Sequence, residues 1–319
     1  MRGPQIAVLG ECMLELSPRT GTGTGNSFSL AAAGDTYNTA VALAQLGCSP
    51  EYLTGLGQDR HSQFIIEHAT ELGVGTNGIQ RSDHLQPGLY LIDNDAQGER
   101  YFSYWRKDSA AHQTLREPSL LLPLLETAVS ASRLYLSGVT LALCEASGRQ
   151  VLWGWLEEFR AGGGVVIYDS NYRAALWPDL SSAREAHLQM LEHTVIFLPG
   201  VDDELLLQGL ADKSALTNLL SALPLQELVL KDGSAQVLLL EGGNVRAFET
   251  APVERVVDAS GAGDAFNGGY MAARIRGLDK SAAVGFACSV AATVIQHRGA
   301  VLPRSAWQPL RDKLQDLIA

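Results

Sequence analysis

Short apolar runs alternate with helix-length segments along most of this chain, and this alternation constrains its fold more than any other feature. The apolar runs predict strands at 6–9, 51–57, 78–81, 133–137, 165–168 and 194–198, and a strand pair at 227–231 and 236–240. Helical spacing of apolar residues predicts helices at 37–46, 62–72, 145–160, 183–191, 215–222, 268–275 and 281–296. Strands and helices in repeated alternation build a parallel sheet with helices on both faces. The sequence therefore predicts an α/β protein with a central, mostly parallel sheet.

Two segments break this alternation. Each contains two stretches in which apolar and polar side chains alternate, as in strands with one solvated face, around a segment rich in turn residues. The expected strands are 13–16 and 27–31 in the first segment and 88–93 and 99–105 in the second, with turns at 18–26 and 93–98. We expect the two hairpins to form a small second sheet that acts as a lid over the edge of the main sheet. The expected core comprises 1–10, 35–86 and 107–319, and the expected lid comprises 11–34 and 87–106.

The composition excludes several classes of protein. The 319 residues have a formal charge of −11, with 46% hydrophobic and 18% charged residues. Such a chain is expected to fold, and it offers no basic field that would attract nucleic acid or anionic lipid. An anionic substrate would therefore need local cations. The sequence has neither a signal peptide nor an apolar run long enough to cross a bilayer, so we expect a soluble, cytoplasmic protein.

Common cofactor and metal motifs are missing from the sequence. The four cysteines and seven histidines show no spacing typical of zinc sites or of a disulfide framework. Gly10 ends the first expected strand, but the later glycines of a dinucleotide-binding fingerprint do not follow it, and there is no Walker-type loop. Oxidoreductase chemistry with a nicotinamide cofactor is therefore disfavoured.

One glycine-rich stretch has the composition of a catalytic centre. Asp258-Ala-Ser-Gly-Ala-Gly-Asp264 leads into the apolar helical run 268–275. Glycines let backbone N–H groups approach a ligand, and a helix start adds unpaired donors and positive partial charge, so the stretch can bind an anion. A carboxylate beside that anion suits a base that takes a proton from an attacking nucleophile. The alternative is structural, with Gly261 and Gly263 in a tight turn and Asp264 as a helix cap.

Further candidates lie near the ends of expected strands, where ligands collect in open α/β sheets. Gly34, Asp35 and Asn38 stand at a strand-to-helix junction and suit the hydroxyl groups of a sugar-like ligand. Alternatively, Asp35 caps the helix. Tyr104 and Arg106 share one face of a lid strand and suit a small polyhydroxy acid, because arginine can hold a carboxylate through two parallel hydrogen bonds. Alternatively, they belong to a lid core and a surface ion pair.

Two more clusters follow expected strands. Asp169-Ser-Asn-Tyr-Arg173 places a second arginine where a phosphate or a carboxylate could bind; the alternative is a chain turn at Asp169 and a surface ion pair of Arg173. Lys231-Asp-Gly-Ser234 could let the backbone pass a nucleotide, or it could be a plain hairpin turn.

Together these motifs resemble the ribokinase-like carbohydrate kinases of the PfkB family. Asp258 to Asp264 resembles the family signature near the C-terminus, and Gly34-Asp35-Thr-Tyr-Asn38-Thr-Ala40 resembles the other signature. Further segments are similar to those of its 2-keto-3-deoxygluconate kinases: Gly10-Glu-Cys-Met-Leu-Glu-Leu16, Pro87-Gly-Leu-Tyr90, Tyr101-Phe-Ser-Tyr-Trp-Arg106, Asn171-Tyr-Arg173 and Val294-Ile-Gln-His-Arg-Gly-Ala300. The resemblance implies a ribokinase-like fold with a β-lid. It also implies transfer of a phosphoryl group from ATP, with Mg2+, to the 6-hydroxyl of 2-keto-3-deoxygluconate.

The resemblance also implies roles for individual residues. Asp264 would be the catalytic base, and the anion hole would be formed by Gly261, Ala262 and Gly263. The substrate would be bound by Gly34, Asp35, Asn38, Tyr90, Tyr104, Arg106, Arg173 and Asp264. ATP would be bound by Asn171, Lys231, Gly233, Ala259, Gly261, Ala262, Gly263, Ser289 and Thr293.

The expected metal site departs from the family pattern. Many members carry an Asn-x-x-Glu motif tied to magnesium and phosphate binding, and the corresponding segment here is Val201-Asp-Asp-Glu204. Glu204 would then act indirectly, and Mg2+ would be held mainly through ATP phosphates and water.

Two other functions stay open on the sequence. One is another PfkB-type sugar kinase, such as a fructokinase, and the other is a non-catalytic sensor of sugar acids. The resemblance and the apolar faces of the expected lid also imply a homodimer or a higher homo-oligomer, without nucleic-acid or membrane partners.

Overall fold

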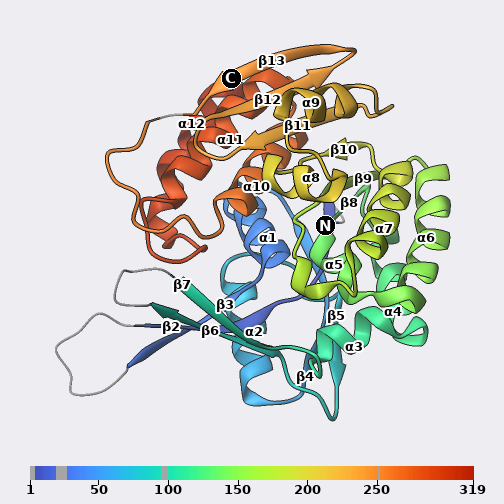
Figure 1. Ribbon diagram of the computed structural model, residues 1–319. Helices are drawn as coiled ribbons and strands as arrows, with labels where there is room; N and C mark the ends of the chain where they lie inside the picture. Colours follow the sequence, from blue (N-terminus) through green and yellow to red (C-terminus); the bar gives the residue numbers. More distant parts are fainter. Residues whose placement is uncertain (1–3, 19–26, 95–99, 251) are drawn as a thin grey trace.

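A nine-stranded sheet forms the centre of the molecule in a computed structural model, which describes residues 4–18, 27–94, 100–250 and 252–319 (Figure 1). The strand order is β13-β12-β11-β10-β9-β8-β1-β4-β5. Neighbours from β11 to β5 are parallel, and β12 and β13 add an antiparallel edge. The strands are β1 (Ile6–Leu9), β4 (Pro50–Gly57), β5 (Ile79–Ser82), β8 (Arg133–Ser137), β9 (Val165–Asp169), β10 (Ile196–Phe197), β11 (Glu227–Asp232), β12 (Gln236–Glu241) and β13 (Asn244–Glu249). The predicted α/β class is confirmed.

Helices cover both faces of this sheet, and β1 shows why. Ile6 and Val8 pack into one hydrophobic core, whereas Ala7 and Leu9 pack into the other. Because successive side chains of a strand point to opposite faces, a strand that is apolar at every position is buried between two helical layers. The first layer contains α1 (Asp35–Gln45), α2 (Arg60–Glu71), α10 (Ala262–Ile275), α11 (Lys280–Val294) and α12 (Gln308–Ile318). The second contains α3 (Ala110–Arg116), α4 (Pro118–Glu126), α5 (Gly138–Leu143), α6 (Glu145–Ala161), α7 (Leu180–His193), α8 (Val201–Gln208) and α9 (Lys213–Ser221).

A separate four-stranded sheet forms the predicted lid, and Figure 1 shows it at one end of the core. Its strands are β2 (Met13–Pro18), β3 (Phe28–Ala33), β6 (Gly88–Asn94) and β7 (Arg100–Trp105), in the order β3-β2-β6-β7. Each excursion of the chain contributes an antiparallel pair, and the parallel pairing of β2 with β6 joins the two. The expected turns at 18–26 and 93–98 fall mostly on 19–26 and 95–99, outside the described residues.

Helix α10 begins earlier than the sequence predicted. The prediction started the helix at 268, where the apolar run 268–275 begins, but the helix already begins at Ala262. The glycines are needed for packing: a Cβ on Gly268 would lie 2.5 Å from the Cβ of Ala42, and one on Gly269 would lie 2.9 Å from Val290. They let α1 and α11 approach α10 closely, and the earlier start places Asp264 in the first turn of the helix.

Several elements were not predicted at all. They are β13, α3, α4, α5, α8 and α12. β13 is exposed at most positions because it is an edge strand, so it lacks the apolar alternation on which the prediction relied. No helix within the described ranges is long and apolar enough to span a membrane.

Candidate active site

A cleft with a volume of about 1880 Å³ lies between the lid and the carboxyl ends of the central strands. Residues at the ends of β1, β9, β10 and β11 line it, among them Glu11, Asp169, Gly200 and Lys231. Pockets for one small ligand measure roughly 300–1,000 Å³. The cleft is therefore large enough for two ligands at once.

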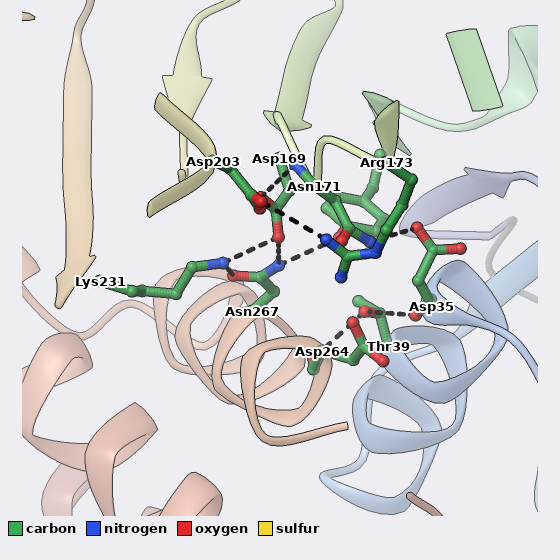
Figure 2. A network of polar contacts seen from close by, with 10 residues as sticks. Asp35, Thr39, Asp169, Asn171, Arg173, Asp203, Lys231, Asp264 and Asn267 are labelled. Atoms are coloured by element: carbon green, nitrogen blue, oxygen red, sulfur yellow. Dashed lines mark hydrogen bonds and ion pairs between the residues drawn. The ribbon is translucent and has the colours of Figure 1, made fainter. Parts of the chain in front are cut away.

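Asp264 and Asn38 meet in the middle of this cleft, from the first turns of α10 and α1. Nδ2 of Asn38 donates a hydrogen bond to Oδ2 of Asp264 at 2.9 Å. The hydroxyl of Thr39 donates to the backbone oxygen of Asp264 at 3.1 Å (Figure 2). Oδ1 of Asn38 is buried and has no hydrogen-bond partner in the described part of the chain. The cleft therefore contains the carboxyl group of Asp264, held by Asn38, and beside it Oδ1 of Asn38 as a further hydrogen-bond acceptor.

The environment of Asp264 favours its protonated form. Burial, followed by the charge of Asp35, raises the pKa of Asp264 to about 8, although the hydrogen bond from Asn38 opposes the shift. Burial likewise raises the pKa of Asp203 to about 6, against the opposing charge of Arg173. An acid whose pKa lies near neutral pH can accept and release a proton during turnover, as a general base must.

The start of α10 is built to receive an anion. Gly261 has φ 71°, and a Cβ there would lie 2.4 Å from the Cβ of Ala300, so only glycine fits. A Cβ on Gly263 would approach nothing closer than Nζ of Lys231, at 3.9 Å. No side chain caps this helix. The N–H of Ala262 donates to the backbone oxygen of Ala259 at 3.4 Å, and the backbone at Gly263 opens onto space beside an ammonium group, where helix starts bind phosphate.

Lys231 is held in place by two partners (Figure 2). Its Nζ donates to Oδ2 of Asp169 at 2.8 Å and to Oδ1 of Asn267 at 2.9 Å. The fully buried Asn267 also donates to Asp169, at 2.6 Å, so the three groups form a closed network. The ammonium is therefore fixed rather than free to follow a ligand.

A second network lies beside the first and includes Arg173 (Figure 2). Asn171 has the unusual φ of 30°, and its Nδ2 donates to Oδ2 of Asp35 at 2.7 Å. Nη1 of Arg173 lies 3.4 Å from Oδ1 of Asp203. Arg173 therefore forms an ion pair, which was one of the two alternatives from the sequence. Its partner, Asp203, lines the cleft. Neither Asp35 nor Asp264 caps a helix, because the caps are Gly34 and Gly261.

The lid adds an aromatic wall and a guanidinium group. The rings of Tyr90, Phe102 and Tyr104 lie 5.7 to 6.4 Å apart. The guanidinium of Arg106 lies 5.7 Å from the ring of Tyr104, and its Nη2 lies 2.5 Å from Oε2 of Glu11. The inner face of the lid thus combines ring surfaces with a charge that is already paired.

Most residues singled out from the sequence line the cleft: Gly34, Asp35, Asn38, Tyr90, Tyr104, Arg106, Asn171, Arg173, Lys231, Gly233, Ala259, Gly261, Ala262, Gly263 and Asp264. Ser289 and Thr293 do not. The hydroxyl of Thr293 donates to the backbone of Ser289, whose own hydroxyl accepts from Lys313. The same stretch faces the cleft through Cys288, Ala291, Ala292 and Ile295 instead.

Glu204 also lies away from the cleft. It is completely buried, with Oε2 at 3.5 Å from Nε2 of His187. Asp203, one position earlier on α8, lines the cleft, because successive residues of a helix point about 100° apart. Within the described residues, no group of three His, Cys, Asp or Glu side chains could hold a metal ion. Asp202 and Asp203 are thus the cleft-lining carboxylates of this segment, and burial raises the pKa of Asp203.

Four polar residues were not assigned a role in the cleft from the sequence: Glu11, Asp169, Asp203 and Asn267. Of these, Asp169 was named only as the site of a chain turn. Glu11 directly follows the first strand, so the rule that ligands collect at carboxyl ends of strands could have found it. Asn267 stands three positions after Asp264, which places both on one side of α10. Both signals are present in the sequence.

Comparisons with known proteins agree with this architecture. The sequence profile of the pfkB family carbohydrate kinases matches residues 4–307. The chain is 37% identical over 310 residues to the 2-dehydro-3-deoxygluconokinase of Escherichia coli, covering 95% of this chain and 98% of that protein. The chain belongs to the PfkB family of carbohydrate kinases.

Solved structures show the same fold. The 2-dehydro-3-deoxygluconokinase of Thermotoga maritima aligns with a TM-score of 0.83 at 21% identity, covering 97% of this chain and 98% of that one. A putative ribokinase II from Escherichia coli, in complex with ATP and Mg2+, aligns with a TM-score of 0.82 at 20% identity, covering 97% and 99%. These similarities concern the fold alone.

Proposed function

We propose that this protein transfers the γ-phosphoryl group of ATP to the 6-hydroxyl of 2-keto-3-deoxygluconate, also called 2-dehydro-3-deoxygluconate. The proposal rests mainly on the position of Asp264. Asp264 lines the same cleft as the start of α10 with the ammonium of Lys231, and as the guanidinium of Arg106 on the lid. A phosphate donor and an acidic acceptor would meet at this carboxylate. The 37% identity to a 2-dehydro-3-deoxygluconokinase supports the choice of acceptor.

Asp264 would accept the proton of the 6-hydroxyl as its oxygen attacks the γ-phosphorus, and ADP would leave with the electrons of the broken P–O bond. Asn38 holds the carboxylate in position through its hydrogen bond. The N–H groups at the start of α10 and Nζ of Lys231 would stabilise the negative charge on the phosphoryl oxygens. Closure of the lid would exclude water, which otherwise competes as the acceptor.

The residues present fit Mg2+ together with ATP. Asp35, Asp169, Asp203 and Asp264 all line the cleft, and burial raises the pKa values of Asp203 and Asp264. Asp203 would hold the ion through water, and ATP phosphates would provide further ligands. When bound, Mg2+ neutralises charge between the β and γ phosphates.

The apolar end of the cleft suits the adenine ring. Cys288, Ala291, Ala292 and Ile295 line it together with Val256. Flat aromatic ligands bind between such side chains, with few polar contacts to fix their orientation. We therefore place the base there, in reach of Gly233, with the phosphates directed towards Gly263.

The acceptor's carboxylate would be bound by Arg106 and Arg173. A protein with a formal charge of −11 needs such local cations to attract an acid. Arg106→Ala is expected to raise KM for the keto acid by about 10- to 100-fold, the value of a charge-assisted hydrogen bond, and to leave KM for MgATP within about threefold. Steady-state kinetics with each substrate varied in turn measure both constants.

Arg246→Ala is the matched control, because Arg246 also lies over an aromatic ring, that of Phe248 at 5.1 Å, but does not line the cleft. It should change neither constant. An unchanged KM for the keto acid in Arg106→Ala would remove Arg106 from the acceptor site.

The rate should depend on pH through Asp264. A base must be deprotonated to act, and the pKa of Asp264 lies at about 8. We therefore expect kcat/KM to rise as pH increases from 6 towards 8 and then to level, and Asp264→Asn to lose this rise. A pH–rate profile of the purified enzyme measures it. A rate that is constant over this range would contradict the assignment of Asp264 as the base.

We also propose that the chain forms a homo-oligomer through the lid. Leu30, Tyr101 and Trp105 are 44%, 60% and 59% exposed on it, and exposed apolar patches of this kind mark protein contacts. Light scattering coupled to gel filtration should give at least twice the 34.2 kDa of one chain, and Trp105→Ser should lower this mass. A monomeric mass at micromolar concentration would contradict the proposal.

A further inference from the structure

Glu11 lies close to the places where the chain passes between core and lid. The chain crosses near residues 11, 34, 87 and 107, and Glu11 occupies the first crossing. A Cβ on Gly34 would lie 2.3 Å from the backbone oxygen of Glu11, and one on Gly88 would lie 3.2 Å from its Oε1. Ser109 donates to Oε1 at 2.8 Å. The backbone oxygen of Glu11 thus borders the crossing at Gly34, and its side chain lies at the crossings marked by Gly88 and Ser109.

This carboxylate is deeply buried and paired. Glu11 is 2% exposed, and its Oε2 lies 2.5 Å from Nη2 of Arg106, whose side chain is 12% exposed. Burial of a charge is costly unless it is paired and hydrogen-bonded, so these contacts are strongly coupled. The mechanism proposed above uses Arg106 but gives Glu11 no part.

Two groups contact the guanidinium of Arg106. Its Nη2 forms an ion pair with Oε2 of Glu11 at 2.5 Å that lacks hydrogen-bond geometry, and the ring of Tyr104 lies 5.7 Å from the group. Nε is buried and has no hydrogen-bond partner in the described ranges. Glu11 and Tyr104 are therefore the groups that orient this guanidinium.

We infer that Glu11 is a positioning residue, which orients Arg106 towards the phosphoryl acceptor and, through Arg106 and Ser109, ties the crossing near residue 107 to the end of β1. The inference rests on the proposed function in assigning Arg106 to the acceptor. The chemistry stays with Asp264, and Glu11 acts only through the guanidinium that it holds.

The test is a double-mutant cycle on the full-length enzyme. Glu11→Ala should raise KM for the acceptor by about 5- to 100-fold, the range of couplings between residues in contact, with KM for MgATP changed by less than about threefold. In an Arg106→Ala background, Glu11→Ala should raise the acceptor KM by no more than about twofold further. Glu11→Gln keeps an oxygen that accepts from Arg106 and a donor for Ser109, so its acceptor KM should stay within about threefold of wild type.

Equal increases of KM in both backgrounds would overturn the inference, because Glu11 would then act independently of Arg106. Equal losses for MgATP and acceptor would also overturn it, since they would indicate a general structural role. If Glu11→Ala does not fold, Ser109→Ala, which removes the hydrogen bond that holds Oε1 of Glu11, takes its place in the cycle with and without Arg106→Ala. The cycle is measured with whichever acceptor saturates the wild-type enzyme. It therefore still gives a result if the keto acid is not a substrate.

Discussion

Asp264→Asn is expected to lower kcat by about 10²- to 10⁴-fold, the usual contribution of a general base. Asparagine retains the oxygen that accepts from Asn38, so the hydrogen bond at 2.9 Å and the helix start should persist. Binding of MgATP and of the keto acid, measured by calorimetry, should therefore change little. Near-normal turnover would contradict the assignment of Asp264 as the base.

The same substitution should stabilise the protein, and the effect should depend on pH. The pKa of Asp264 is raised to about 8 in the folded state, whereas an unfolded aspartate titrates near about 3.9. The folded protein therefore binds this proton more tightly, so its stability falls as pH rises between these two values. The stability of Asp264→Asn does not fall in this way, because asparagine does not titrate. The midpoint of thermal unfolding of the variant should therefore exceed that of wild type, and the difference should be larger at pH 8 than at pH 5.

Asp179→Asn is the control for both measurements. Asp179 is an exposed aspartate that caps α7 by accepting from the backbone of Ser182 at 2.7 Å, and these hydrogen bonds lower its pKa. Its loss should leave kcat unchanged and should not stabilise the protein at pH 8. A rise in stability equal to that of Asp264→Asn would show that any loss of negative charge is sufficient.

Lys231→Met is expected to have the largest effect on stability. The change leaves Asp169, which is 4% exposed, without its cation, and breaking a buried ion pair in this way costs about 3–5 kcal/mol of unfolding free energy. It also removes a donor beside the helix start, so kcat should fall by about 10²- to 10³-fold. Urea unfolding and steady-state kinetics measure the two effects.

Lys213→Met provides a matched comparison. Lys213 pairs with Asp232 at 2.7 Å, almost the distance of 2.8 Å between Lys231 and Asp169, but its side chain is 57% exposed and not 13%. An exposed pair contributes little because water screens it. Its loss should leave the unfolding midpoint and kcat close to wild type. Equal effects of the two substitutions would show that burial does not determine the strength of these pairs.

Much of the fold could be predicted because the pattern of side chains within each single strand or helix indicates how that element is buried. The residues of β1 are apolar at every position, and the structure buries them on both sides. Apolar and polar side chains alternate along the lid strands, and these strands form a separate sheet. β13 escaped prediction because an edge strand buries too little to leave a clear periodic signal. α12 was missed although its sequence shows a helical period, with Leu310 and Leu314 buried one turn apart.

The candidate site shows a different limit, namely helix rotation. Ser289 and Thr293 on α11 were selected, but Cys288 and Ala292 face the cleft. This helix is apolar on nearly all sides, so its sequence does not fix which side faces the ligand. The same one-residue error separates Glu204 from Asp203, and only packing resolves it.

Contacts between distant segments could not be derived from the sequence. Arg106 was recognised as a cation suited to a carboxylate, yet Glu11, its ion-pair partner, lies at the first crossing between core and lid. Asp264 was recognised from its glycine-rich surroundings, whereas its raised pKa depends on burial and on the charge of Asp35 from α1. The sequence identified the groups, and the fold sets their charge and orientation.

The most direct measurement is the specificity of the wild-type enzyme for its acceptor. ADP release in the presence of MgATP would be followed with 2-keto-3-deoxygluconate, its C4 epimer 2-keto-3-deoxygalactonate, fructose and ribose, and the product would be identified by phosphorus NMR. We expect kcat/KM for 2-keto-3-deoxygluconate to exceed that for fructose by about 10²-fold or more, because a neutral sugar leaves the charge-assisted hydrogen bonds of Arg106 and Arg173 unmade, with phosphate found at O6. A higher kcat/KM for a neutral sugar, or no ADP release with either keto acid, would contradict the proposed function.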